Sequence, residues 1–161
     1  MTAGELLADE LRHSVHGDAW HGPSLREAVA GITAEEAMQR PIPAAHSIWE
    51  LVLHITTWSN IGLRRIIGAQ PEPYVGEDWR LPAEFSESHW KEAVAEMVAS
   101  HEQLCDVVAG LTNEELERNA PGSERSIAFM LHGIAQHDAY HGGQISLLRK
   151  AITRQHRRAA L

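Results

Sequence analysis

The chain has 161 residues, of which 43% are apolar and 22% are charged, and its formal net charge is −8. This composition is typical of a globular protein, and the length predicts a single domain over residues 1–161. The acidic balance argues against a nucleic-acid partner, which requires a basic surface. The lone Cys105 cannot form an internal disulfide. The sequence shows neither a signal-peptide pattern nor an apolar run of about 20 residues, so we expect a cytoplasmic protein with no membrane partner.

Capping boxes, each a Ser or Thr followed three residues later by Glu, begin helices in the N-terminal quarter of the chain. The first helix is predicted to run to about His16, and two short helices follow before Pro41 and Pro43. The capping pairs are Thr2–Glu5, Ser24–Glu27 and Thr33–Glu36.

A long helix is predicted from Ser47 to about Ile67, because apolar residues recur there at helical spacing. His54 lies on or beside the apolar stripe of this helix, and Glu50 lies one turn before it. Residues 68–85 follow without any periodicity and are rich in proline, glycine and aromatic residues. Loops of this length commonly act as lids or binding loops. The alternative, which does not exclude the first, is a long crossover that its aromatic residues pin to the bundle.

The third long helix is predicted over residues 86–109, and a short helix capped by Thr112 and Glu115 follows it. His101 lies on the apolar stripe of the long helix. A lone histidine there is more often a satisfied core residue than a metal ligand. The last helix opens at Ser126.

His137 and His141 are four residues apart on this last helix, so they point the same way, one turn apart. Two imidazoles at this spacing can hold one divalent metal ion, and the alternative is a pair of solvated surface histidines. Gln144, one turn later on the same face, is placed to orient a ligand or a bound water. Gly142 and Gly143 each weaken a helix by about 1 kcal/mol relative to Ala, which indicates close packing beside the histidines.

The other polar residues near this pair are interpreted more plainly. Asp138 lies off the face of the pair, and a supporting role for it stays open. His132 is about 140° away around the helix, too far to join the pair. His46, His89 and His156 are interpreted as solvated or capping residues, although eleven histidines are many for this length.

An internal duplication is indicated by two segments that align without gaps at an offset of 79 residues. Residues 30–36 (AGITAEE) match residues 109–115 (AGLTNEE), and Ser47-Ile48 matches Ser126-Ile127. Coincidence between common capping patterns is the alternative. Duplication predicts an all-α fold, an antiparallel four-helix bundle built from two helical hairpins. The last helix is then equivalent to the helix of His54, and His54 is predicted to face His137 and His141.

Three neutral histidines at one site leave at least one coordination position for water or substrate, the open arrangement of catalytic centres. Zinc and nickel both accept imidazole nitrogen. Such an ion lowers the pKa of a bound water to about 7, polarises a carbonyl, or stabilises a thiolate. Glu50 and Gln144 are candidates for proton transfer or for orienting a ligand, and a solvated surface position is the alternative for Glu50.

The chain resembles the DinB/YfiT-like superfamily of metal-dependent enzymes. The resemblance is carried by residues 20–25 (WHGPSL), 47–55 (SIWELVLHI), 73–79 (PYVGEDW) and, most specifically, 132–145 (HGIAQHDAYHGGQI). It implies an antiparallel four-helix bundle with an internal repeat, often a homodimer, and a nickel or zinc site made by His54, His137 and His141. Some members are similar to thiol S-transferases that use a low-molecular-weight thiol such as bacillithiol or mycothiol, and others are described as hydrolases by analogy.

Three hypotheses about function follow. The first is a metal-dependent thiol transferase or hydrolase that acts on a small electrophilic molecule. The second is a metal- or small-ligand-binding module without turnover. The third treats the histidines as a polar network in the core that needs no metal. The sequence does not choose the substrate, the thiol or the metal.

Overall fold

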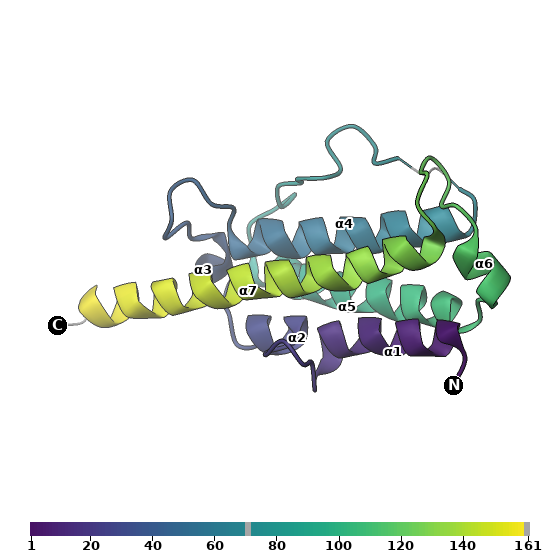
Figure 1. The fold of residues 1–161 in the computed structure, drawn as a ribbon. Helices are drawn as coiled ribbons and strands as arrows, with labels where there is room; N and C mark the ends of the chain where they lie inside the picture. Colours follow the sequence, from purple (N-terminus) through teal and green to yellow (C-terminus); the bar gives the residue numbers. More distant parts are fainter. Residues whose placement is uncertain (70–71, 160–161) are drawn as a thin grey trace.

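The computed structural model of the protein describes residues 1–69 and 72–159 (Figure 1). Over these residues the chain is all-helical, as predicted, apart from an isolated β-bridge between Asn119 and Ser126. Positions 70–71 of the predicted loop and positions 160–161 of the predicted domain lie outside the described residues. The helices are α1 (Ala3–His16), α2 (Leu25–Val29), α3 (Ala34–Met38), α4 (Ile48–Ile66), α5 (Glu87–Ala109), α6 (Asn113–Glu117) and α7 (Ile127–Ala159).

Reciprocal capping fixes where most of these helices begin. In each capping box the Ser or Thr hydroxyl accepts from the backbone N–H three residues on, and the glutamate there accepts from the N–H of the cap. Two backbone donors that the helix leaves unpaired are thereby satisfied. The four predicted boxes are confirmed, and a fifth forms at the start of α4. The capping residues are Thr2, Ser24, Thr33, Ser47 and Thr112.

The long helices α1, α4, α5 and α7 pack in a ring, with α1 against α5, α5 against α4, α4 against α7 and α7 against α1. This is the arrangement of a four-helix bundle. In Figure 1, α1 and α7 run in one direction and α4 and α5 in the other, so α1–α5 and α4–α7 are the antiparallel neighbours. α4 and α5 run the same way because the long segment between them returns along the bundle. No helix in the described part of the chain is long and apolar enough to span a bilayer.

The predicted offset of 79 residues is kept by the structure. α3 and α6 begin 79 positions apart, at Ala34 and Asn113, and α4 and α7 begin 79 positions apart, at Ile48 and Ile127. The first half differs because its opening helix is broken into α1 and α2, with a positive φ of 136° at Gly17. α4 and α7 are therefore equivalent elements, and they lie side by side as antiparallel neighbours.

Two apolar clusters fill the bundle at different levels along the helices. One contains the N-terminal parts of α4 and α5 and the C-terminal part of α7, around Trp49. The other contains the C-terminal part of α5 and the N-terminal part of α7, around Leu104. Between them lies a layer of buried polar side chains, and each long helix contributes one of them. These residues, called the polar layer below, are Ser14, Ser59, His101 and Asp138.

Candidate metal centre

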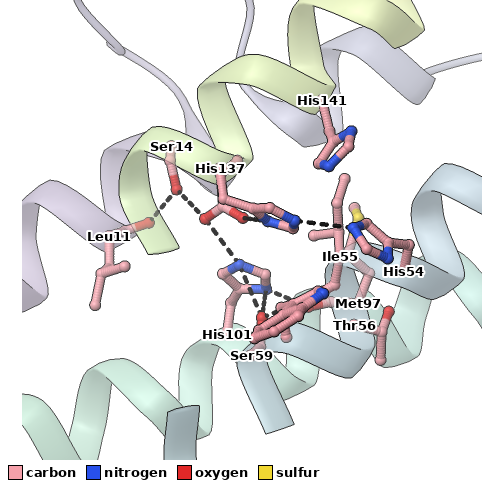
Figure 2. A network of polar contacts seen from close by, with 12 residues as sticks. Leu11, Ser14, His54, Ile55, Thr56, Ser59, Met97, His101, His137 and His141 are labelled. Carbon is pink, nitrogen blue, oxygen red and sulfur yellow. Dashed lines mark hydrogen bonds and ion pairs between the residues drawn. The ribbon is translucent and has the colours of Figure 1, made fainter. Parts of the chain in front are cut away.

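The structure brings together the three histidines that the sequence predicts, His54 from α4 and His137 and His141 from α7 (Figure 2). The Nε2 atoms of His54 and His137 are 3.0 Å apart, and one ring nitrogen from each of the three residues lies within 4.8 Å of the others. His54 and His141 are buried, and His137 is half-buried. We call these three residues the histidine cluster.

In two of the three histidines, the ring nitrogen that points away from the cluster is hydrogen-bonded to an oxygen. Nδ1 of His54 lies 2.8 Å from the backbone oxygen of Asp78, and Nδ1 of His141 lies 2.6 Å from Oε1 of Gln144. Because a carbonyl oxygen only accepts, each Nδ1 donates its proton outward, and the Nε2 lone pair is left for the cluster. Gln144 thus orients His141 in this structure.

Charge and distance both suit a divalent ion. Burial lowers the pKa of His54, and it lowers the pKa of His141 to about 4, although the Asp78 carbonyl and the Gln144 amide oppose these shifts. Both rings are therefore neutral, which is the form that binds metals. Nitrogen ligands of a tetrahedral zinc lie about 3.3 Å from one another, given bond lengths of about 2.0–2.1 Å. The separations in the cluster bracket this value, so the donor set fits the ion.

Trp79, from the loop between α4 and α5, covers His54. Its indole ring stacks on the imidazole of His54, with ring centroids 3.8 Å apart and an angle of 4° between the planes. The other face of the indole stacks on His46, with a centroid separation of 3.6 Å. His46, predicted to be a solvated or capping residue, keeps 43% of its side chain exposed, and the indole ring of a distant loop residue covers one face of its imidazole, which the sequence did not predict.

The segment around Trp79, residues 74–80, is called the strap. Its contacts with α4 include the following three. Arg64 forms a bidentate ion pair with Glu77, with both N···O distances 2.9 Å. Trp58 Nε1 donates to Oδ1 of Asp78 over 2.8 Å, and the Asp78 carbonyl binds His54. The crossover is thus pinned to the bundle, as one alternative predicts, and the pinned part lies on the histidine cluster.

Behind the cluster, the polar layer joins all four long helices (Figure 2). Oδ2 of Asp138 lies 3.0 Å from Nε2 of His101 and 3.0 Å from Oγ of Ser14. Burial disfavours both charges, yet the pair overrides it: Asp138 raises the pKa of His101, and His101 lowers the pKa of Asp138. His101 is a satisfied core residue, as predicted, and the carboxylate it binds is the neighbour of a cluster histidine.

Glu50 does not reach solvent, so the interpretation of it as a solvated residue was wrong. Its side chain is only 6% exposed, and Arg40 contacts both carboxylate oxygens at 2.6 Å. One oxygen also accepts from the backbone N–H of Ser47 over 2.8 Å, as part of the capping box. These contacts explain the conformation of Glu50, and its predicted part in proton transfer stays a prediction.

The glycine pair of α7 does not mark a close approach, contrary to the sequence interpretation. A Cβ built on Gly142 would meet Leu25 at 3.5 Å, an ordinary contact, and one on Gly143 would meet nothing within 4 Å. The tight glycines lie elsewhere. A Cβ on Gly4 would lie 2.6 Å from the carbonyl oxygen of Val108, where α1 crosses the end of α5.

Two hollows reach the cluster from different sides. A cavity of about 420 Å³ has His141 and Gln144 in its wall, and a smaller cleft of about 240 Å³ has His137 in its wall. The cavity is lined by Ile42, Ala44, Ala45, His46, Leu51, Trp79, Tyr140, His141, Gln144, Leu147 and Leu148. The cleft is lined by Trp58, Ile61, Gly62, Arg65, Met130, Gly133, Ile134 and His137. Each hollow thus borders one histidine of the cluster.

Comparison with known proteins supports the predicted resemblance. Searches of curated protein sequences and of solved structures found no match. A sequence model described as the DinB superfamily matches residues 19–145. The matched segment covers most of the chain and contains the whole histidine cluster, the strap and Asp138. The chain therefore belongs to the DinB superfamily.

Proposed function

We propose that the protein is a metal-dependent enzyme that acts on a small electrophilic molecule, as a thiol-dependent transferase or a hydrolase. The observation that carries the proposal is the convergence of three imidazoles in a largely buried site, with Nδ1 of His54 and of His141 already bound to oxygen. Holding the rings in one orientation in advance lowers the entropy that ligand binding must overcome.

His54, His137 and His141 would hold the ion, and zinc and nickel are the proposed metals. A divalent ion on three imidazoles keeps a position for a further ligand and acts there as a Lewis acid that favours the deprotonated form of a thiol or of water. The strap contributes by excluding water from one face of His54, through the indole ring of Trp79.

The two hollows favour a transferase over a hydrolase. A transfer reaction needs room for two substrates at one centre, whereas a hydrolase needs room for one substrate and water. The cavity beside His141 is walled mostly by aliphatic and aromatic side chains, and the described residues that line it include no Lys or Arg. We therefore assign it a neutral, apolar electrophile, and the cleft beside His137 is the proposed approach for the low-molecular-weight thiol.

Two further residues have proposed roles. Gln144 would hold His141 in the Nδ1–H form, through the 2.6 Å contact between them. Glu50 would act in proton transfer only after its carboxylate leaves Arg40, which now contacts both oxygens. A homodimer is proposed from the family resemblance, and size-exclusion chromatography with light scattering tests it.

The direct test is metal analysis of protein purified without a histidine tag, followed by a conjugation assay. The assay mixes several low-molecular-weight thiols with a reactive chloro-aromatic. We expect metal-dependent turnover that is lost in His54→Ala. His132→Ala is the matched control, because His132 is an exposed histidine that pairs with Glu10 away from the cluster. Less than about a tenth of an equivalent of transition metal per chain would contradict the proposal.

A second candidate is a metal- or ligand-binding module without turnover. The observation that favours it is the occupation of both Glu50 oxygens by Arg40, which leaves that carboxylate engaged rather than poised to take a proton. Stoichiometric metal with no turnover across the thiol panel would support this candidate. Turnover that depends on His54 would exclude it.

A further inference from the structure

The hydrogen bond between His54 and His137 has a defined direction. Nδ1 of His54 faces the carbonyl oxygen of Asp78 at 2.8 Å, so this nitrogen carries the proton of the neutral ring. Nε2 of His54 is then a bare acceptor. Since Nε2 of His137 lies 3.0 Å from it, His137 must be the donor. In its neutral form, His137 therefore carries its proton on Nε2 and none on Nδ1.

The bare Nδ1 of His137 faces an unpaired acceptor. It lies 3.9 Å from Oδ1 of Asp138. Both atoms are buried, and neither has a hydrogen-bond partner among the described residues. Two buried acceptors that face each other are unfavourable, because each has lost its hydration and neither gains a proton. A proton placed on Nδ1 would satisfy both atoms once they move from 3.9 Å to hydrogen-bond distance, about 2.9 Å.

The other side of the carboxylate is fully engaged. Oδ2 of Asp138 lies 3.0 Å from Nε2 of His101, whose Nδ1 lies 2.9 Å from the backbone oxygen of Met97. Ser14 Oγ also lies 3.0 Å from Oδ2, and Ser59 Oγ lies 3.0 Å from the ring of His101. His101 thus presents an N–H to an acceptor on each side. The network fixes the carboxylate in place and leaves Oδ1 as the free acceptor beside His137.

We propose that Asp138 is a positioning residue that selects the ligand form of His137, an inference that rests on the proposed metal site. A nitrogen that binds a metal cannot keep its proton. For His137 to serve through Nε2, that proton leaves to water, and Nδ1 takes up a proton from water and donates it to Oδ1 of Asp138. One proton leaves and one arrives, so the charge of the ring is unchanged. The two unpaired buried atoms then form one hydrogen bond, which requires a closure of about 1 Å from their present 3.9 Å separation.

The first test reads the proton directly in the wild-type chain. Nitrogen-15 NMR of the imidazole rings distinguishes the Nε2–H from the Nδ1–H form, and Zn²⁺ is the probe ion. We expect His137 to be the Nε2–H form without metal and the Nδ1–H form with zinc, with an Nδ1 proton that exchanges slowly with water. Zinc bound while His137 keeps its Nε2 proton would overturn the inference and leave the proposed function intact. No zinc binding at all would overturn both.

The second test is Asp138→Asn. Because His101 needs an acceptor, the amide oxygen turns toward His101 and the NH₂ group turns toward His137. That NH₂ donates to Nδ1 and holds His137 in the Nε2–H form, the wrong one for the metal. We expect the zinc Kd to rise at least about tenfold in the folded variant. The matched control is Asp106→Asn at an exposed aspartate, whose Kd should equal that of wild type.

A folded Asp138→Asn variant whose zinc Kd lies within twofold of wild type would refute the positioning role. If this variant does not fold, Ser14→Ala takes its place. It removes one contact to Oδ2 and leaves Oδ1 untouched, so the zinc-loaded ring should still show the Nδ1–H form. Loss of that form in Ser14→Ala would contradict the assignment of the role to Oδ1.

Discussion

Trp79→Ala should weaken zinc binding at the proposed site, although all three proposed ligands, His54, His137 and His141, stay in the chain. Two contacts would be lost or weakened in Trp79→Ala. The parallel stack on His54, at 3.8 Å, is worth about 0.5–1.5 kcal/mol. The hydrogen bond from Nδ1 of His54 to the Asp78 carbonyl, one residue along the strap, contributes about 1 kcal/mol. Together they amount to about 2 kcal/mol, and we expect zinc to dissociate about 30-fold faster.

The assay is the transfer of bound zinc to an excess of a coloured chelator, followed by stopped flow. The matched control is Trp20→Ala, because Trp20 is fully exposed whereas Trp79 is 37% exposed. Trp79→Phe keeps a ring at the position and should fall between Trp79→Ala and wild type. A dissociation rate for Trp79→Ala within threefold of wild type, or an equal increase in Trp20→Ala, would refute the role given to the strap.

Four other substitutions or conditions test the remaining points, each by urea unfolding. Glu50→Gln should lower the free energy of unfolding by about 1 kcal/mol, because it weakens both the partly exposed ion pair with Arg40 and the capping box of α4. An unchanged free energy would show that these two contacts do not stabilise the fold. The pKa of His141 is about 4 in the folded chain and near 6.5 when unfolded, so the unfolded state binds more protons between these values. Stability of the metal-free protein is therefore complete above pH 6.5, and it should be about 1–2 kcal/mol lower at pH 5; equal values at pH 7.5 and pH 5 would contradict this. Gly143→Ala should add about 1 kcal/mol, because a Cβ there meets nothing within 4 Å, and a loss of stability would show that something does pack there. Asp138→Leu alone should lower the free energy of unfolding by about 3–5 kcal/mol, because it leaves His101 unpaired. The double variant with His101→Leu should regain most of that loss. Additive losses in the double variant would refute the coupling between Asp138 and His101.

The helices were predictable because local patterns specify them, and the cluster was predictable because an internal repeat relates α4 to α7. A Ser or Thr with Glu three residues on satisfies backbone donors within one turn, so the capping boxes mark helix starts without any tertiary information. The contact between distant helices was predicted from the offset of 79 residues. This offset made α4 and α7 equivalent, which put His54 opposite His137 and His141. The repeat supplied a contact between distant segments that periodicity within one helix cannot supply.

The strap was not predictable in the same way. A loop has no period, so nothing local to Trp79 indicates which helix it will cover. Its stacking on His46 and His54 depends on the path of the crossover, which the fold as a whole sets. The interpretation of Gly142 and Gly143 as a site of close packing was wrong for a related reason. Helical glycines were interpreted as a sign of close packing, but the side of α7 at Gly143 faces open space, and only the tertiary arrangement decides that.

The polar layer did leave a signal in the sequence. Asp138 lies at a core position in the spacing of alternating three and four residues that α7 follows through Leu131, Ile134, His141 and Ile145, all of which are buried. Burying a carboxylate on an apolar stripe costs free energy, so its presence there indicates a function. The sequence interpretation considered only that Asp138 lies off the face of His137 and His141, and it therefore gave Asp138 too little weight.

The position of this layer connects the stability of the fold to its chemistry. Apolar residues fill the bundle on both sides of the layer, and by area alone the fold would be at least as stable with apolar residues throughout. Instead, α5 and α7 bury an ion pair, His101 with Asp138. Among the described residues, the layer leaves Oδ1 of Asp138 without a hydrogen-bond partner, and Oδ1 lies 3.9 Å from Nδ1 of His137. A helical bundle does not need such an atom for its stability, whereas the proposed change of the protonated nitrogen in His137 does need an acceptor at this position.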